Sequence, residues 1–504
     1  MKTKKMVCML LSFALFAVAV SSIAGCGSST VGEEKGVLTI SYTECGYGDV
    51  WLNAAAKAFE ASHEGVTVKL DGSASLGENV LTNLKSGQNL SDVYMILDGA
   101  WQEWVSKGYI ASLDTVYETE VDTKDGKQKI KDYMLDDIRG KYYMQRVAGQ
   151  GETKPWVLPW ALVQIGICYN EDILKATPRR AQSGNWTEPP ATVAELLEYC
   201  GDLTARNIVP FVLPGNANWL EFLMRGWWAQ QQGVYEPNTA AGVAASEGAY
   251  YDFWNFASAN VWRQSGIRKA METFQSIFVD VSSGSWKNTN INSTSYSVKD
   301  AERQFINGTN AMILGGSFLY NEMRDYLDLN KDGKDDLTFK MMPLPLTENA
   351  QTDSEGNPLR ITYYSTDDIM FVPAKATNLD LAKEFLAFLC NEANLNEFTQ
   401  TSGSIRPFKY NASSAAGEKV NPFTRSVMEL YTDPKAVRLF SYPVKAELNE
   451  VSPLYRYKRL DMHGGMEQTQ FFSDIRKVNA VTLAGTISAS AEKEYPKWKN
   501  ELGL

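Results

Sequence analysis

Short apolar runs and helical apolar stripes alternate along the first hundred residues. Three runs have the length and side chains of buried strands: residues 38–43, 66–70 and 92–97. Between the first two, residues 49–62 place Trp51, Leu52 and Phe59 on one face of a helix, and a second helix is expected near residues 76–86. Strands and helices in this alternation predict βα units around a parallel sheet.

The same alternation returns after residue 150. Residues 156–170 and 209–213 have the character of strands and flank a helical stretch at 193–206, and a Trp-rich helix is expected at 218–232. Residues 305–318 predict a turn followed by an apolar strand. Ligands of such sheets bind beyond the carboxyl ends of strands, and in the first part of the chain these ends fall at 44–47 and 98–101.

The N-terminus has the features of a secretory signal. A cationic start, MKTKK, precedes an apolar run over residues 7–23 that ends in small residues, which is typical of a signal peptide and not of a membrane span. The segment Ile23-Ala24-Gly25-Cys26 resembles a bacterial lipobox. This resemblance implies cleavage after residue 25, diacylglycerol and palmitate on Cys26, and a tether over 26–36; an ordinary signal peptide with an incidental cysteine is the alternative.

Charge and length narrow the class of protein further. The formal charge of −11 becomes −14 when Lys2, Lys4 and Lys5 leave with the signal, and an acidic body argues against a nucleic-acid partner. The remaining 479 residues (504 minus 25) exceed one compact core and predict two lobes. Four cysteines stay in the body, far apart and without a CxxC pair, which favours buried free thiols over disulfides: Cys45, Cys168, Cys200 and Cys390.

Six segments, taken in their order, resemble the sugar-binding, maltose-binding-protein-like family of extracellular solute-binding proteins: residues 58–70, 86–114, 157–174, 191–215, 305–318 and 382–408. The second reads SDVYMILDGAWQEWVSKGYIASLD from Ser91, and the fifth reads FINGTNAMILGGSF. Ser91 and Gly65 stand where the family usually has proline, and Phe318 stands where it often has tryptophan. The last difference weakens any ligand role for Phe318.

The resemblance implies an α/β fold of two discontinuous lobes joined by hinge crossings, as in periplasmic binding proteins. Lobe one is expected to hold residues 37–155 and 309–345, and lobe two residues 156–308 and 346–504. The ligand would lie between the lobes, and their closure would signal to the transmembrane subunits of an ABC permease. We expect a monomer at the extracellular face of the cell membrane that needs no cofactor.

A sugar offers hydroxyl groups that bind charged or amide side chains and flat C–H faces that stack on aromatic rings. Candidate ligand residues at strand ends, turns and predicted crossings are Glu44, Tyr47, Asp98, Trp101, Trp160, Trp219, Trp286, Asp368 and Arg406. Trp160 and Arg406 are included because the resembling family places ligand contacts at the matching points. Each has a plain alternative, which is hinge or core packing for the tryptophans, helix capping for Asp98 and Tyr47, and a salt bridge for Arg406.

Residues 328–336 follow the opening of a calcium-binding loop. Oxygen ligands fall at positions 1, 3, 5 and 9 with a glycine at position 6, and the candidate ligands are Asp328, Asn330, Asp332 and Asp336. Position 12 is Phe339 instead of the bidentate glutamate of an EF-hand. A structural calcium site and a solvated turn both remain open.

A secreted glycosidase is the rival function, since it needs only two carboxylates. The sequence contains no GxSxG, HExxH or P-loop motif, and His63 and His463 are its only histidines, so a binder is favoured over an enzyme. Tryptophans at strand ends favour a sugar. The number of candidate aromatic platforms favours an oligosaccharide over a monosaccharide. A polyamine, anion or peptide ligand stays open, as does the identity of the sugar.

Overall fold

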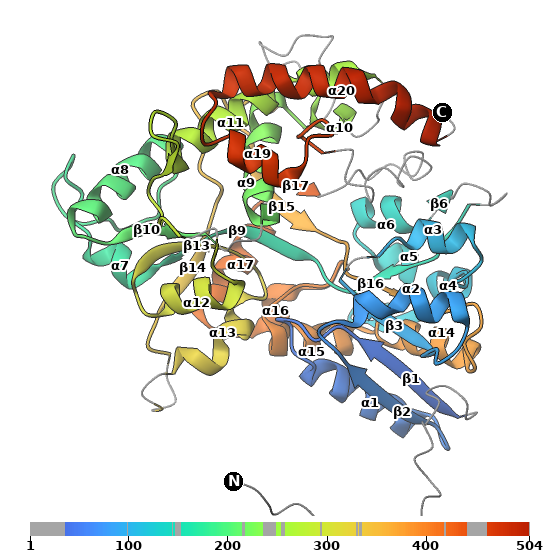
Figure 1. The fold of residues 1–504 in the computed structure, drawn as a ribbon. Coiled ribbons are helices and arrows are strands. Elements are labelled where there is room, and N and C mark those ends of the chain that lie inside the picture. Colours follow the sequence, from blue (N-terminus) through green and yellow to red (C-terminus); the bar gives the residue numbers. More distant parts are fainter. Residues whose placement is uncertain are drawn as a thin grey trace, which may run out of the picture.

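Two mixed β-sheets organise the chain into two lobes (Figure 1). The computed structural model describes residues 36–97, 99–143, 145–146, 153–213, 217–234, 248–253, 258–292, 295–328, 331, 335–417, 420–440 and 461–502. None of the helices in these ranges is long and apolar enough to cross a membrane.

The sheet of lobe one has five strands in the order β2-β1-β3-β16-β8. Their bounds are Thr67–Gly72 for β2, Val37–Tyr42 for β1, Val93–Ile96 for β3, Ile369–Phe371 for β16 and Leu158–Pro159 for β8. The first three strands are parallel, as predicted, and β16 runs antiparallel to both β3 and β8. Every residue of β3 and β16 is buried, so both faces of the sheet centre are covered.

The sheet of lobe two follows the order β10-β13-β9-β15-β17, with β14 paired to β9 as well. The strands are β10 (Val209–Val212), β13 (Asn310–Gly316), β9 (Val163–Asn170), β15 (Arg360–Ser365), β17 (Ala436–Phe440) and β14 (Phe339–Met342). Met312 and Leu314 pack into one apolar core and Ile313 into the other. This alternation shows that the sheet lies between two apolar layers, because successive side chains of a strand point to opposite faces.

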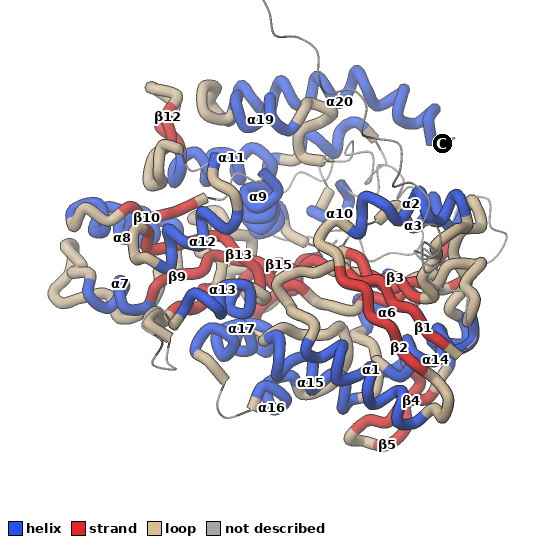
Figure 2. The backbone as a smooth tube through the Cα atoms, turned by 60° about the horizontal axis from the view of Figure 1, so that its bottom comes forward, coloured by secondary structure: helices blue, strands red, loops and turns tan. Residues whose placement is uncertain are grey.

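Helices cover both sheets (Figures 1 and 2). Lobe one carries α1 (Val50–Ser62), α2 (Leu76–Ser86), α3 (Trp101–Ser106), α4 (Asp114–Glu118), α5 (Ile130–Tyr133), α6 (Asp136–Tyr142) and α14 (Leu379–Phe388), with the β4–β5 hairpin (Glu120–Thr123 and Gly126–Lys129) and the short strands β6 (Gln145–Arg146) and β7 (Thr153–Lys154). Lobe two carries α7 (Glu171–Ala176), α8 (Val193–Ala205), α9 (Ala217–Gln232), α10 (Tyr250–Phe253), η1 (Ala259–Arg263), α11 (Ser265–Phe278), α12 (Val298–Ile306), α13 (Leu319–Leu327), α19 (Gln468–Asp474) and α20 (Ala480–Leu502), with the β11–β12 pair (Val279–Asp280 and Ser285–Trp286).

Three helices of the C-terminal half run from one lobe to the other: α15 (Glu392–Ser402), α16 (Ala412–Ala416) and α17 (Pro422–Thr432). α15 packs on α1 of lobe one, and α17 packs on β14 of lobe two. The predicted helices and strands of the first 232 residues are confirmed to within two residues at each end, except that residues 160–162 divide the predicted run 156–170 into β8 and β9, which belong to different sheets.

The sheets divide the chain differently from the predicted lobe boundaries. β13 and β14 lie within residues 309–345, which were expected in lobe one, yet both pair with β9 in the sheet of lobe two. β16 lies within residues 346–504, which were expected in lobe two, and it pairs with β3 in lobe one. An apolar strand of this length fits the centre of either sheet, and only its hydrogen-bonding partner determines which sheet it joins.

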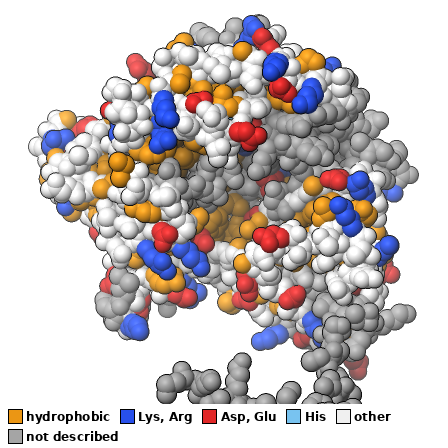
Figure 3. Space-filling view, in the orientation of Figure 1, with side chains coloured by type: hydrophobic (Ala, Val, Ile, Leu, Met, Phe, Trp, Pro, Cys, Tyr) orange, Lys and Arg blue, Asp and Glu red, His pale blue; other side chains and the backbone are white. Residues whose placement is uncertain are grey.

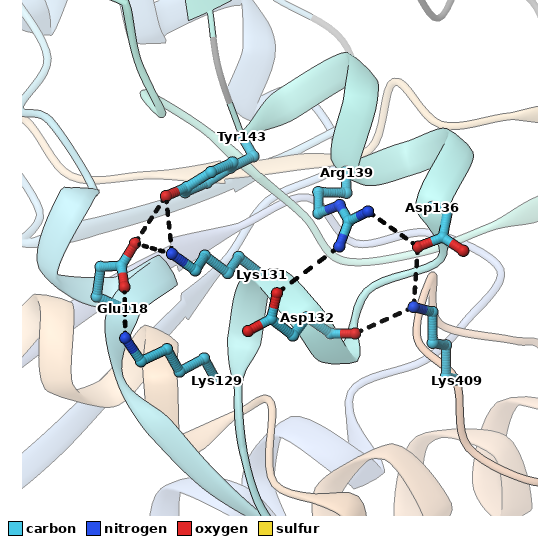
Figure 4. A network of polar contacts seen from close by, with 8 residues as sticks. All are labelled: Glu118, Lys129, Lys131, Asp132, Asp136, Arg139, Tyr143 and Lys409. Carbon is cyan, nitrogen blue, oxygen red and sulfur yellow. Dashed lines mark hydrogen bonds and ion pairs between the residues drawn. The ribbon is translucent and has the colours of Figure 1, made fainter.

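A surface network fastens the chain after α15 to lobe one (Figure 4). Lys409 Nζ lies 2.9 Å from Asp136 Oδ1 and donates to the Asp132 carbonyl oxygen at 3.1 Å, while Lys409 N donates to the Tyr133 carbonyl. In the same network, hydrogen bonds from Lys131, Tyr143 and Lys129 lower the pKa of Glu118 to about 2. The three contacts of Lys409 hold the chain after α15 against lobe one.

Asp92 joins three parts of lobe one below the surface. Its side chain is fully buried and accepts hydrogen bonds from Thr39 N at 2.9 Å, Thr39 Oγ1 at 3.0 Å and Asn378 N at 2.8 Å. These contacts connect β1, the start of β3 and the start of α14. The carboxylate therefore satisfies backbone donors that have no access to water.

We expect Asp92→Ala to lower the free energy of unfolding by about 3 kcal/mol, because it leaves buried donors without a partner. Urea denaturation followed by tryptophan fluorescence measures this. Asp71→Ala is the matched control, since Asp71 is exposed in the edge strand β2 and should change stability little. Equal stability of the two variants would contradict the structural role of Asp92.

Candidate functional site

The carboxyl ends of strands from both sheets meet at the junction of the lobes. In lobe one, β1, β3 and β8 end there and β16 begins there; in lobe two, β10, β13, β15 and β17 end there. Figure 2 shows the strands of both sheets converging on this point, and Figure 3 shows a hollow between the lobes with hydrophobic side chains at its floor. A hollow at this edge is the usual place for a ligand of an open α/β sheet.

Two crossings join the sheets through this junction. Residues 160–162 lead from β8 to β9, and residues 366–368 lead from β15 to β16. Trp160 N donates to the Asp368 carbonyl at 2.9 Å, which ties the two crossings together. Leu162 N donates to the Ile405 carbonyl at 2.9 Å, so the segment after α15 forms a third part of the hinge.

Trp160 lies inside the hinge and not on the surface of the hollow. Its side chain is 3% exposed, it stacks on Trp51 with a ring separation of 5.9 Å, and it meets Tyr47 edge-on at 5.1 Å. Its indole Nε1 donates to the Ile96 carbonyl at 3.3 Å. The structure thus agrees with the alternative of a packed hinge residue, since the ring has no exposed face for a ligand.

Arg406 is also a buried hinge residue. Its guanidinium is fully buried and donates through Nε to the Trp160 carbonyl at 3.0 Å and through Nη1 to the Leu389 carbonyl at 2.6 Å. Burial lowers its pKa. The side chain therefore links the third segment to the first crossing.

The second crossing is held from lobe one. Tyr47 donates its hydroxyl hydrogen to Asp368 Oδ2 at 3.0 Å, and both side chains are buried. Burial and the Asp368 charge raise the pKa of Tyr47 well above its usual range. On the neighbouring residue, Asp367 Oδ1 lies 3.4 Å from Lys141 Nζ, and the same ammonium donates to Thr366 Oγ1 at 2.9 Å.

The structure therefore brings four of the predicted residues together, namely Tyr47, Trp160, Asp368 and Arg406, and it does so in the hinge. Glu44 follows β1 and is exposed at the same edge. Trp101 is buried in the core of lobe one.

Trp286 lies in the core of lobe two. It is 9% exposed, meets Phe274 edge-on and has the Arg476 guanidinium 5.4 Å from its ring centre. Asp98 and the side chain of Trp219 lie outside the described residues.

Sequence reasoning missed several residues at this edge. Leu97, at the end of β3, is 37% exposed, and Val50, at the start of α1, is 59% exposed. Leu97 continues an apolar run and could have been identified as an exposed strand end. The sequence did not indicate a hinge role for Lys141, because the residue reaches the second crossing only when α6 packs against residues 366–367.

A further hollow within lobe two, with an empty volume of about 480 Å³ that includes open solvent, opens where β14 and β15 separate along β9. Its lining is largely aliphatic and aromatic, with Phe222, Leu314, Met341, Leu344 and Ile361 among its residues. Such a surface offers few partners for hydroxyl groups, so the junction is the better candidate for a polar ligand.

Two of the four predicted calcium ligands lie outside the described residues. These are Asn330 and Asp332, whereas Asp336 N donates to the Leu327 carbonyl at 2.7 Å. Among the described residues, no group of three His, Cys, Asp or Glu side chains could hold a metal ion. The site stays a prediction.

The four body cysteines are free thiols in the structure. Cys168, Cys200 and Cys390 are buried, and burial raises the pKa of Cys390 to about 12. The preference for buried free thiols over disulfides is confirmed for these three, and Cys45 is half-buried at the junction.

Comparison with known proteins defines the class. A profile of the bacterial extracellular solute-binding protein family matches residues 54–422, and the chain belongs to this family. No curated protein matches the chain.

Solved structures confirm the two-lobed α/β fold. A raffinose complex of the solute-binding protein RafE has 15% identity and a TM-score of 0.58, with 91% of this chain and 100% of that chain covered. The GacH receptor of Streptomyces glaucescens, solved with and without acarbose, has 17% identity and a TM-score of 0.59 over 92% and 99% of the two chains. A chitin oligosaccharide binding protein has 14% identity and a TM-score of 0.55 over 91% and 99%.

We expect Trp160→Ala to lower the free energy of unfolding by about 3–5 kcal/mol, because the ring fills the hinge core between Trp51 and Tyr47. Trp160→Phe should keep most of this packing and serves as the matched variant. Thermal and urea unfolding measure the effect. If Trp160→Ala leaves stability unchanged, the ring does not have the packing role that its burial indicates.

Proposed function

We propose that this protein captures an oligosaccharide between its two lobes and delivers it to an ABC permease. The observation that carries the proposal is the junction itself, where two short crossings join the lobes at the carboxyl ends of their strands beside a hollow. Such a joint lets two rigid lobes close on a ligand while their cores stay intact. The mature chain acts as a monomer in this proposal.

Membership of the family supports a binding role, and the similar folds support a sugar as the solute. Three structural neighbours bind raffinose, acarbose and a chitin oligosaccharide, respectively. In this chain the lobe-one edge of the hollow offers Glu44 and the exposed apolar side chains of Val50 and Leu97. A carboxylate can bind hydroxyl groups, and apolar surface can cover the C–H face of a sugar ring.

The proposal is tested by titrating the mature protein with raffinose, acarbose and chitin oligosaccharides in separate experiments. A true ligand at about a hundred times its Kd should stabilise the fold by about 2.7 kcal/mol, measured as a rise in Tm, and calorimetry should give one site. Small-angle X-ray scattering should show a smaller radius of gyration as the lobes close.

Chromatography of the same mixtures separates a binder from a glycosidase. A binder returns the sugar intact, whereas shorter products would show that the enzyme alternative is right. Spermidine, phosphate and a tripeptide, tested in the same way, represent the other ligand classes, and stabilisation by one of these alone would contradict the sugar proposal.

We propose further that lipid on Cys26 anchors the protein to the extracellular face of the cell membrane. The cationic start, the apolar run and the small residues before Cys26 support this. The acyl chains would hold the captured sugar close to the permease, with residues 27–36 as the tether.

Cys26→Ser should abolish incorporation of radiolabelled palmitate and move the protein from the membrane fraction into the medium. Ser28→Ala is the matched control and should remain labelled and membrane-bound. A Cys26→Ser protein that still carries the label and sediments with the membrane would exclude this cysteine as the anchor.

A further inference from the structure

The first turn of α13 in lobe two directly contacts the loop between β1 and α1 in lobe one, next to the hinge. Asn321 Nδ2, in the first turn of α13, donates to the Gly46 carbonyl at 2.7 Å in the loop between β1 and α1. Phe318 packs edge-on to Tyr47 with ring centres 5.8 Å apart. A Cβ atom on Gly46 would lie 2.8 Å from Phe318 Cδ2, so the close approach requires glycine there. We call this contact, made by Phe318 and Asn321 with residues 46–47, the lower joint.

Two carboxyl groups lie directly behind the lower joint. Glu302 of α12 and Glu322 of α13 line one cavity with an empty volume of about 240 Å³, and they are its only ionisable residues. Glu302 is 4% exposed, and its Oε1 has no hydrogen-bond partner. Glu322 is half-buried and follows Asn321 in sequence.

The carboxyl pair is able to hold a proton. The two carboxyl groups line the same cavity, and each affects the ionisation of the other. Burial raises the pKa of Glu302, and the charge of Glu322 raises it further. Burial also raises the pKa of Glu322. Two neighbouring buried carboxyl groups avoid double ionisation because both charges would be desolvated and would repel each other.

Positive charges on the surrounding elements do not neutralise the carboxyl pair in place of the proton. Lys299 and Arg303 on α12 act on the pair, but both side chains are exposed and therefore screened by water. From lobe one, Cys45 and Tyr47 face Glu322, and Asp368 lies beyond them. Further negative charge on Glu322 would thus be added beside a region that already contains the Asp368 carboxylate.

The other lining residues argue against a metal ion. They are Val298, Ile313, Leu314, Gly315, Phe318 and Leu319, none of which has a side-chain oxygen. Calcium requires six to eight oxygen ligands in typical sites, and two carboxylates supply at most four.

We propose that Glu302 and Glu322 form a proton-binding site that controls the lower joint and through it the relative setting of the two lobes. With the proton bound, the pair is compact and carries at most one negative charge, and α13 stays against residues 46–47. Loss of the proton places two repelling charges behind the first turn of α13 and loosens its contact with lobe one. The solute-binding protein would then open more readily as the pH rises.

The sign of the linked stability follows from the raised pKa values. An unfolded glutamate ionises near pH 4.3, whereas the folded pair retains its proton above that value. Below about pH 4 the glutamates are protonated in both the folded and the unfolded state. The stability that the protonated pair contributes is lost as the pH rises through the folded pKa. Replacing Glu302 by glutamine reduces this dependence, because the amide stays neutral and only Glu322 can still ionise.

The experiment uses the unliganded mature protein, so that its outcome does not depend on whether a sugar binds. Infrared difference spectra between wild type and Glu302→Gln report a protonated carboxyl group. Small-angle scattering from about pH 5 to pH 9 reports the lobe setting. EGTA is present throughout to remove any effect of calcium at residues 328–336.

Wild type should show a protonated-carboxyl band that disappears as the pH rises, together with an increase in radius of gyration. Glu302→Gln and Glu322→Gln should each show a radius independent of pH, and the second variant tests the site if the first does not fold. Glu348→Gln, which changes an exposed carboxylate of lobe two, should behave as wild type.

Three results would overturn the proposal. They are the absence of the infrared band, a wild-type radius that does not change with pH, and a pH-dependent radius that persists in Glu302→Gln. A radius set by sodium concentration at constant pH would identify a cation site in place of the proton site.

Discussion

The hydrogen bonds between the chain crossings are the constraint on which the two-lobed structure depends. One apolar core fills lobe one and extends to one face of the lobe-two sheet. Within it, main-chain hydrogen bonds hold the crossings together, among them Trp160 N to the Asp368 carbonyl and Leu162 N to the Ile405 carbonyl. These groups are buried under an aromatic cluster of Tyr47, Trp51 and Phe398, which excludes competing water. Because a buried main-chain group is costly to leave unpaired, the crossings stay in register while the lobes keep freedom to move about them.

The buried polar groups at the hinge act mainly by fixing the positions of the crossings and less through ion pairs. Arg406 donates through Nε and Nη1 to two carbonyl oxygens, and Asp368 accepts from Tyr47, so these hydrogen bonds join ionised groups to neutral partners. Among the described residues, Lys141 and Asp367 form an ion pair at the second crossing, and Lys141 also donates to Thr366. Directional hydrogen bonds of this kind fix a hinge more closely than apolar packing, which tolerates small shifts.

The lower joint is a second connection between the lobes, and it is held by different interactions from those at the crossings. There the lobes meet through one hydrogen bond and a tight apolar contact at Gly46, and two carboxyl groups lie behind it. In the proposed mechanism, a second charge behind this contact loosens it. The fold thus combines a hinge that keeps its geometry with a joint that can respond to its environment.

The sequence by itself determined the elements and the class of fold. Apolar periodicity located the strands near 38–43, 92–97 and 209–213 and the helices near 49–62 and 193–206, because burial of a strand or helix face is recorded in local spacing. The order of segments also indicated the solute-binding family, which the match over residues 54–422 confirms.

Which sheet residues 310–316 join was decided only by the tertiary structure, because β9 and β10 can accept any apolar strand of suitable length. The same holds for Trp160 and Arg406, which the family resemblance suggested as ligand residues without showing that Trp51, Phe398 and Leu389 would enclose them. Sequence spacing records that a side chain is buried, and only long-range packing decides what covers it.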